Sequence, residues 1–238
     1  MRSRPQEPIR TPGPGDLLRE LRLPVDALRW VPELVSNRPR RSRHPATVLL
    51  LPGFGTGPRA MHVLEVYLRN CGHRVRDWGL GHNTGEAQRL RVALEPVIGA
   101  LAERDGEPVT LVGWSLGGFI AREYARERPG DVRAVVTMGT PVIGGPRYTA
   151  TARRYQAQGH DLDELERAVM QRYERPLEVP VTAIYSKRDG IVAWQACIDR
   201  WSPKVRHVEV DETHLGLVLS PRVRGIVADA IDRRRPER

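Results

Sequence analysis

A serine flanked by glycines is the best candidate for a reactive side chain in this 238-residue chain. Gly113, Ser115 and Gly117 form a Gly-x-Ser-x-Gly pattern, with an apolar run at 108–112 before it and helix-forming residues after it. A serine at such a strand-to-helix joint sits on a sharp turn that projects its hydroxyl, and glycines are needed because side chains would collide there. The pattern predicts a nucleophile. The alternative is a helix start that only needs small residues.

The elbow and two further segments are similar to a known family. With this elbow the chain resembles the α/β-hydrolase superfamily, and within it the bacterial lipases and esterases, over about residues 46–232. Pro-Gly-Phe-Gly at 52–55 is similar to the family's oxyanion loop, and Gly-Thr-Pro at 139–141 to its Gly-Thr-Pro-His stretch, although Val142 replaces the His. Trp114 stands where many lipases have His. The resemblance implies a serine hydrolase with a catalytic triad.

A serine hydroxyl is a weak nucleophile unless a base takes its proton and a carboxylate orients that base. The family's chain order is Ser, then acid, then His. Asp189 follows an apolar run and matches the acid loop, with Asp199 and Asp211 as alternatives. His214 lies between the last predicted strand and the last predicted helix, where the family places its base, and the other six histidines fit this order badly. The resemblance thus implies a triad of Ser115, His214 and Asp189; the other interpretation of Asp189 is a carboxylate that only shapes a turn.

The resemblance also assigns the groups around the reacting carbonyl. The backbone amides of Phe54 and Leu116 would form the oxyanion hole, since an amide at a helix start is suited to developing negative charge. Trp114 and Val142 are expected to contact the substrate and to give an apolar acyl pocket. The arrangement requires no metal and no cofactor.

The elements that must position these residues alternate between short apolar runs and helical patterns. This alternation is typical of a parallel sheet covered on both faces, so an α/β fold with about six parallel strands is expected. The predicted strands are 46–51, 73–78, 108–112, 132–138, 179–185 and 205–210. The predicted helices are 59–70, 86–104, 116–128, 161–175 and 221–233.

The hydrolase domain is expected to span 46–238, with an insert at about 142–178. In the insert, an apolar stripe runs from Leu162 to Tyr173, and Asp161 suits a helix start. The insert is interpreted either as a short helical lid or as an ordinary crossover helix with long loops. Residues 1–45 form a basic amphipathic appendage, whose two short helices would pack on the domain, on a second copy, or on a membrane surface.

The net charge of +9 is unevenly distributed. Residues 1–45 hold 10 Arg against 5 acidic residues, and the last six residues hold 4 Arg against one Glu. The rest of the chain is therefore almost neutral, which argues against a phosphate-binding groove and against nucleic acid as a partner. A small, largely apolar or neutral acyl ester is the expected partner.

Only two cysteines occur, Cys71 and Cys197, and they are predicted to be reduced and buried. No zinc-finger spacing, Walker loop, secretory signal or membrane-spanning run is present in the sequence. A cytoplasmic location follows as an expectation. The oligomeric state is left open.

Taken together, these features predict a serine hydrolase of the esterase or lipase type that cleaves carboxylic esters through an acyl-enzyme. A thioesterase, lactonase or acyltransferase would use the same triad, and so these remain alternatives. A hydrolase-like protein that only binds a ligand or a membrane is the alternative from a different class.

Overall fold

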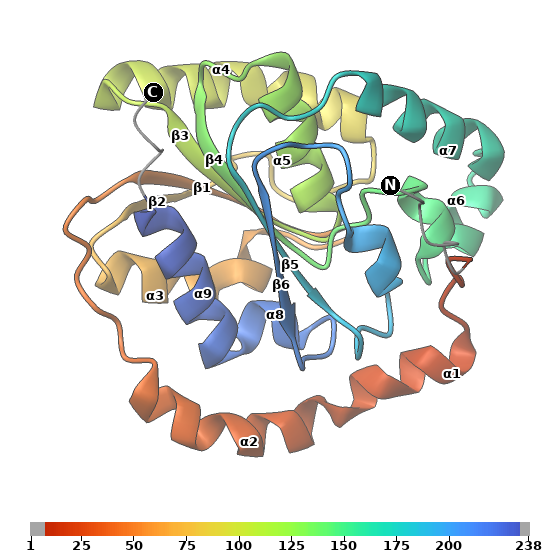
Figure 1. Cartoon of the computed structure of the whole chain (residues 1–238), viewed down its shortest axis with the longest axis horizontal. Helices are drawn as coiled ribbons and strands as arrows, with labels where there is room; N and C mark the ends of the chain where they lie inside the picture. Colours follow the sequence, from red (N-terminus) through yellow and green to blue (C-terminus); the bar gives the residue numbers. More distant parts are fainter. Residues whose placement is uncertain (1–7, 234–238) are drawn as a thin grey trace, which may run out of the picture.

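A six-stranded, all-parallel sheet forms the centre of the molecule, seen in a computed structural model that describes residues 8–233 (Figure 1). The strand order is β2-β1-β3-β4-β5-β6. The strands are β1 (Thr47–Leu51), β2 (Arg74–Asp77), β3 (Val109–Trp114), β4 (Val132–Met138), β5 (Val181–Ser186) and β6 (Val205–Val210). The expected α/β fold with six parallel strands is confirmed, and the basic residues 234–238 lie outside the described residues.

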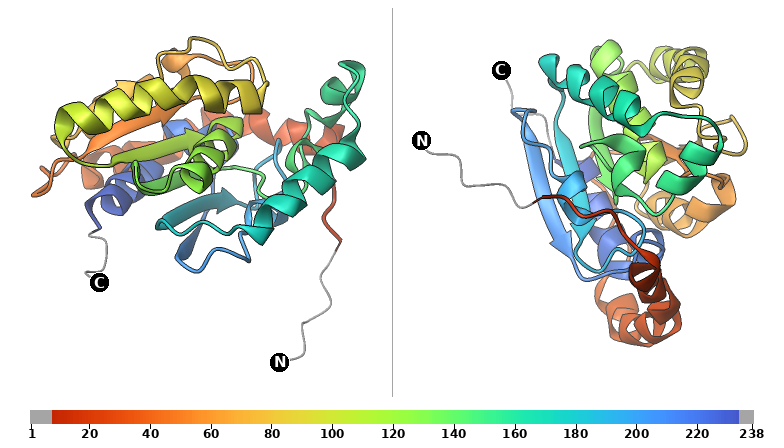
Figure 2. Two further views of the ribbon diagram at one scale, coloured as in Figure 1. Left: turned by 90° about the horizontal axis from the view of Figure 1, so that it is seen from above. Right: turned by 90° about the vertical axis from the view of Figure 1, so that its right-hand side faces the viewer.

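The sheet is covered by helices on both faces, which explains why its central strands are mostly apolar (Figure 2). Every residue of β1 and β3 is buried, as expected for strands with no solvent-facing side. One core cluster joins the sheet to α3 and α9, and a second joins its other face to α4 and α5. These helices are α3 (His62–Asn70), α4 (Ala87–Asp105), α5 (Leu116–Glu127) and α9 (Pro221–Asp232).

Between β4 and β5 the insert forms its own small unit at one end of the sheet (Figure 1). Its α-helices are α6 (Ala152–Ala157) and α7 (Leu162–Gln171), and its 3-10 turns are η3 (Gly145–Tyr148) and η4 (Arg172–Glu174). The carboxylate of Asp161 accepts the amides of Asp163 and Glu164, so the predicted helix start is confirmed. Val169 and Tyr173 are buried in a third core cluster.

A strap of helices precedes β1 and runs along the edge of the molecule below α8 and α9 (Figure 1). We call residues 14–36 the N-terminal strap: α1 (Pro14–Leu17), η1 (Leu18–Arg22) and α2 (Leu23–Ser36). Two prolines, Pro24 and Pro32, lie within this strap and do not interrupt α2. Pro24 lies in the first turn of α2, where a missing amide costs nothing, and the helix continues through Pro32.

The remaining short elements lie in the connections between strands and helices. They are η2 (Pro58–Met61), η5 (Trp194–Cys197) and α8 (Gly216–Leu219). None of the helices within residues 8–233 is long and apolar enough to cross a membrane.

Candidate active site

Ser115 occupies a strained turn between β3 and α5. Its φ of 53° and ψ of −123° make it the only non-glycine residue with positive φ within residues 8–233. Such a conformation costs free energy and persists only where the surrounding structure enforces it. Here the Ser115 amide donates to the Met138 carbonyl at 2.8 Å and the Thr140 hydroxyl donates to the Ser115 carbonyl at 2.9 Å. The turn is therefore fixed by hydrogen bonds to the last residue of β4 and to Thr140 just after it.

The glycines around Ser115 are required by close backbone packing. A Cβ on Gly113 would overlap the backbone of Gly118, and a Cβ on Gly117 would overlap the Leu51 carbonyl of β1. A Cβ on Gly118 would collide with the Thr140 hydroxyl. Each glycine thus permits a contact that a larger side chain would prevent, which explains the Gly-x-Ser-x-Gly-Gly pattern.

Asp189 and His214 lie next to each other although 25 residues separate them. Asp189 Oδ2 is 2.7 Å from His214 Nδ1, and both side chains are buried. Asp189 Oδ1 accepts the amides of Ile191 and Val192, each at 2.8 Å. The carboxylate is therefore fixed by its own loop and orients the imidazole, so that Nε2 is the nitrogen left for other partners.

The two alternative acids make different contacts. Asp199 is buried in an ion pair with Arg122, with 2.6 Å between the charged atoms. Asp211 pairs at the surface with Arg29 and Arg188. Neither contacts His214, which leaves Asp189 as the acid beside this imidazole.

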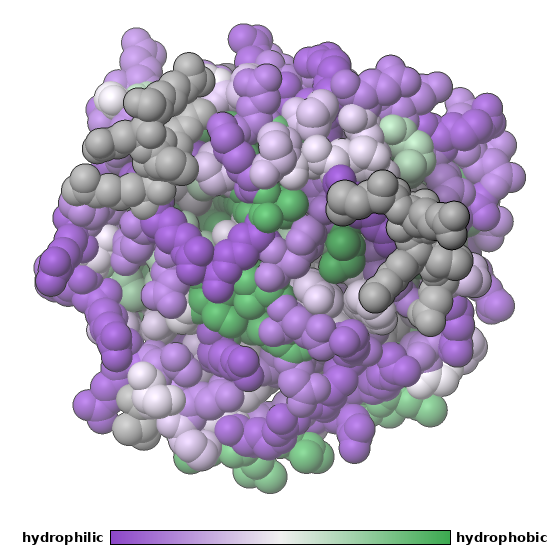
Figure 3. All heavy atoms as spheres, viewed as in Figure 1, coloured by the Kyte–Doolittle hydropathy of each residue, from purple (hydrophilic) through white to green (hydrophobic). Residues whose placement is uncertain are grey.

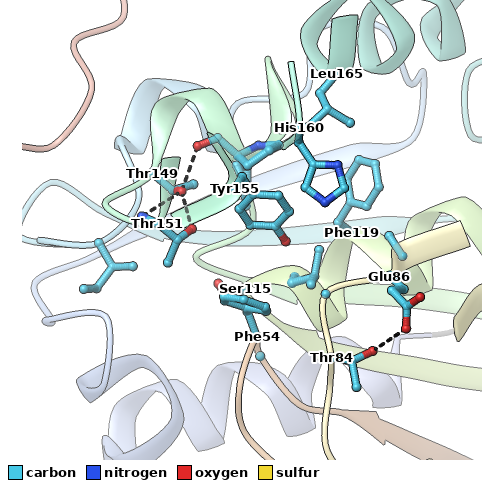
Figure 4. Close-up of a pocket in the computed structure, with 18 of the residues that line it drawn as sticks. Phe54, Thr84, Glu86, Ser115, Phe119, Thr149, Thr151, Tyr155, His160 and Leu165 are labelled. Carbon is cyan, nitrogen blue, oxygen red and sulfur yellow. Dashed lines mark hydrogen bonds between the residues drawn. The ribbon is translucent and has the colours of Figure 1, made fainter. Parts of the chain in front are cut away.

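A cavity of about 1300 Å³ joins Ser115 and His214 (Figure 4). Its wall is mostly apolar, and the insert supplies one side of it through residues of α6 and α7. Figure 4 shows Phe54 beside Ser115, with Tyr155 above them and His160 further along the same wall. No hydrogen bond joins the Ser115 hydroxyl to His214 in the described part of the chain, and such bonds often form only with substrate present.

The other predicted site residues differ in position. Phe54 and Leu116 both line the cavity, and among the described residues neither amide donates to another protein group. Trp114 lines the cavity too and also contacts His214: its Nε1 donates to the His214 carbonyl at 3.2 Å, and the ring centroids are 5.2 Å apart. Val142 is not brought to the cavity. It is 1% exposed and belongs to the core of the insert.

Several cavity residues were missed by sequence reasoning. Tyr155 lies on α6, a helix too short to give a periodic signal, and its ring centroid is 5.4 Å from Phe54 and 5.7 Å from His160. Burial raises the pKa of Tyr155 to about 12, so its phenol stays protonated at neutral pH. From the strap, Leu17 and Glu20 line the cavity. No sequence pattern signals contacts between segments so far apart.

The described residues contain no group of three side chains suited to a metal ion. The site brings together a hydroxyl, an imidazole, a carboxylate and backbone amides.

A sequence comparison identifies the family. The profile of the Alpha/beta hydrolase family matches residues 22–233, most of the chain. This chain belongs to the alpha/beta hydrolase family. The match spans all six strands and the loops that carry Ser115, Asp189 and His214. The resemblance inferred from the elbow is thus confirmed.

Esterases are found among the curated relatives of this alpha/beta hydrolase. The pimeloyl-[acyl-carrier protein] methyl ester esterase of Aromatoleum aromaticum is 37% identical over 93 residues, which cover 39% of this chain and 36% of that protein. The enzyme with the same name from Methylococcus capsulatus is 43% identical over 58 residues, 24% of this chain and 21% of that protein. The chain therefore matches about a third or less of the length of these relatives.

Solved structures agree with the fold of this alpha/beta hydrolase. A chain from the structures of LipS and LipT, two metagenome-derived lipolytic enzymes, has a TM-score of 0.64 at 15% identity, covering 82% of this chain and 96% of that chain. Alpha/beta hydrolase domain-containing protein 10 from mouse has a TM-score of 0.58 at 19% identity, covering 81% and 90%. At these identities the likeness concerns the fold alone.

Proposed function

We propose that the protein is a serine hydrolase that cleaves carboxylic esters with an apolar acyl group. One observation carries the proposal: the 2.7 Å contact between Asp189 and His214, beside a cavity that also contains the strained Ser115. A buried carboxylate on Nδ1 leaves Nε2 available as a base toward the cavity hydroxyl. The esterase activity named for the partial relatives supports an ester as substrate.

The proposed reaction has two steps. In the first, His214 takes the proton of Ser115 while the hydroxyl oxygen attacks the ester carbonyl, and His214 then protonates the departing alcohol. In the second, His214 takes a proton from water, the resulting hydroxide attacks the acyl-enzyme, and the acid leaves as Ser115 regains its proton. Asp189 stabilises the imidazolium throughout, and the amides of Phe54 and Leu116 hold the oxyanion.

The substrate class follows from the cavity wall. Phe54, Phe119, Leu165 and Val169 give an apolar surface suited to an acyl chain, and the cavity volume of about 1300 Å³ leaves room for a long one. Thioesters, lactones and acyl transfer use the same groups and are kept as second candidates. A cytoplasmic location stays a prediction from the sequence.

Replacing Ser115 tests the proposal directly. Wild type is expected to hydrolyse p-nitrophenyl acyl esters and to react with a fluorophosphonate probe, whereas Ser115→Ala loses about 10⁴-fold or more in kcat and all labelling, because the nucleophile is gone. Ser36→Ala, at an exposed strap serine, serves as the control and keeps wild-type rates. Equal inertness of wild type and Ser115→Ala toward ester and probe would contradict an ester-cleaving enzyme.

A further inference from the structure

One carboxylate from the N-terminal strap is bonded to both loops that carry the proposed acid and base. Glu20 Oε1 accepts the amide of Gly190 at 3.0 Å and the amide of His214 at 2.9 Å. Glu20 Oε2 accepts the amide of Leu215 at 3.1 Å. The first amide follows Asp189 directly, and the second belongs to the proposed base itself. Glu20 therefore bridges the tips of the two loops.

The acid loop is shaped to receive the strap at this point. A Cβ on Gly190 would collide with the Asp16 carbonyl and lie 3.2 Å from Glu20 Oε1, so only glycine allows the strap to approach this closely. Beside it, Arg188 donates to the buried carboxylate of Asp26 at 2.9 Å. The strap thus contacts successive residues on both sides of Asp189.

Within residues 8–233, the other hydrogen bonds between the two loops lie nearer to the strands. The Glu212 amide donates to the Ser186 hydroxyl at 3.2 Å, and Arg188 donates to the Asp211 carbonyl at 3.2 Å. These bonds fix the parts of the loops next to the strands. The 2.7 Å contact between Asp189 and His214 depends instead on the position of the loop tips. Backbone amides bonded to a charged acceptor are held more strongly than amides bonded to a neutral one. Because Glu20 binds both loop tips, it is placed to fix the distance between Asp189 and His214.

We propose that Glu20 is a positioning residue that holds His214 and the Asp189 loop in register, so that the N-terminal strap forms part of the catalytic apparatus. The proposal rests on the proposed function for its kinetic consequence. Its structural consequence, the geometry of the contact between Asp189 and His214, is independent of any substrate.

The test compares Glu20→Ala and Glu20→Gln with the control Glu33→Gln. Glu33 is a carboxylate of the strap that has no hydrogen bond to either loop in the described structure. Glu20→Ala is expected to lower kcat on a p-nitrophenyl ester by up to about 100-fold with KM nearly unchanged, because a small misplacement of reacting groups has an effect of this size. Glu20→Gln keeps one amide-accepting oxygen and recovers part of the rate. Glu33→Gln stays at the wild-type rate.

A spectroscopic readout separates positioning from general stability. The low-field ¹H NMR resonance of the proton between Asp189 and His214 is expected to shift or broaden in Glu20→Ala and to be unchanged in Glu33→Gln, at a temperature where both are folded. Unchanged kcat and an unchanged resonance in Glu20→Ala overturn the proposal. If Glu20→Ala does not fold, Glu20→Gln carries the same test. If wild type itself is inert to esters, the proposed function fails, while the resonance still decides the role of Glu20.

A different observation, on the outer side of the strap, carries a second inference. None of the four acidic residues of the strap is exposed, whereas its three arginines are exposed. Seven of its apolar side chains are exposed as well, and Leu21 and Leu28 are each 73% exposed. Figure 3 shows this apolar surface at the lower edge, where α2 lies in Figure 1. The exposed apolar residues are Leu17, Leu18, Leu21, Val25, Leu28, Val31 and Leu34.

The charges beside this outward face distinguish between a second copy of the chain and a lipid surface as its binding partner. The exposed charges of the strap and of the linker that follows it are all positive, including Arg22, Arg38, Arg40 and Arg43. A second copy docked face to face would bring these like charges together, whereas an anionic lipid surface would neutralise them and bury the leucines. Leu17 also lines the cavity, so the stripe is continuous with the cavity wall. We infer that the outward face of the strap docks on an anionic lipid surface.

Vesicle binding tests this inference. Wild type is expected to co-sediment with vesicles of phosphatidylglycerol and phosphatidylcholine, to bind pure phosphatidylcholine weakly, and to lose affinity as salt is raised. Leu21→Ser combined with Leu28→Ser should weaken binding about 10-fold or more, because two anchoring side chains are lost. Val63→Ser combined with Val66→Ser, at exposed valines of α3, is the matched control.

Three outcomes contradict the docking inference. They are absence of binding by wild type, equal loss in the control, and a wild-type dimer in solution that the strap variant dissociates. The last outcome would assign the surface to a second copy of the chain.

Discussion

Burial and neighbouring charge shift the pKa of Asp199 in opposite directions. Burial alone would raise the pKa of this carboxyl, but the charge of Arg122 and hydrogen bonds from Ser202 and Arg122 outweigh it and lower the pKa to about 2. An unfolded Asp has a pKa of about 3.9. The stabilisation from this group is therefore complete above about pH 4 and is lost as the pH falls toward 2.

Asp199→Asn is expected to lower the free energy of unfolding by about 3–5 kcal/mol at pH 7, because it leaves the Arg122 charge buried without a partner. Asp211→Asn, at an exposed ion pair with Arg29 and Arg188, should cost about 1 kcal/mol or less. Urea unfolding measures both. The difference between wild type and Asp199→Asn should shrink as the pH falls from about 4 to about 2. Equal costs for the two variants would contradict this assignment of the buried pair.

At the scale of elements, the helix after the elbow depends on backbone contact with β1. Gly117→Ala would drive a Cβ into the Leu51 carbonyl, and neither backbone can move without disturbing the sheet. The expected loss is about 3 kcal/mol or more, or failure to fold. Gly99→Ala, in α4 with no atom near its added Cβ, is the matched control and should gain about 0.5–1 kcal/mol. Thermal or urea unfolding gives both values, and a neutral Gly117→Ala would refute the close approach.

Strands β1, β3, β4 and β5 were predictable from the sequence because each is a mostly apolar run followed by a turn. β3 extends two residues further than predicted, since Gly113 and Trp114 pair with the end of β4. The Asp189–His214 contact was anticipated from the family's chain order, and the roles of both residues stay predictions. The contacts of Glu20 could not be anticipated, because its partners lie 170 to 195 residues away and no local pattern encodes such a distance.

At the scale of the whole molecule, the two thiols report on global unfolding. Cys71 and Cys197 are free and buried, as predicted, and burial raises the pKa of Cys197 well above its usual value. The native protein is therefore expected to react very slowly with a thiol reagent such as DTNB, and to react at two equivalents in denaturant. In denaturant, Cys71→Ser should react with one equivalent of DTNB instead of two. Rapid reaction of the native protein would contradict the burial of these residues.

The strap also affects the order in which the molecule is completed during synthesis. Glu20 leaves the ribosome long before Gly190, His214 and Leu215, so its three bonds are among the last that the chain can form. Closing so long a loop costs entropy that local contacts do not, which further delays the step. A nascent chain holding Ser115 thus lacks both its proposed base and the strap contact. Competence for acyl chemistry is expected to arise only when the strap has bound the loops that follow β5 and β6.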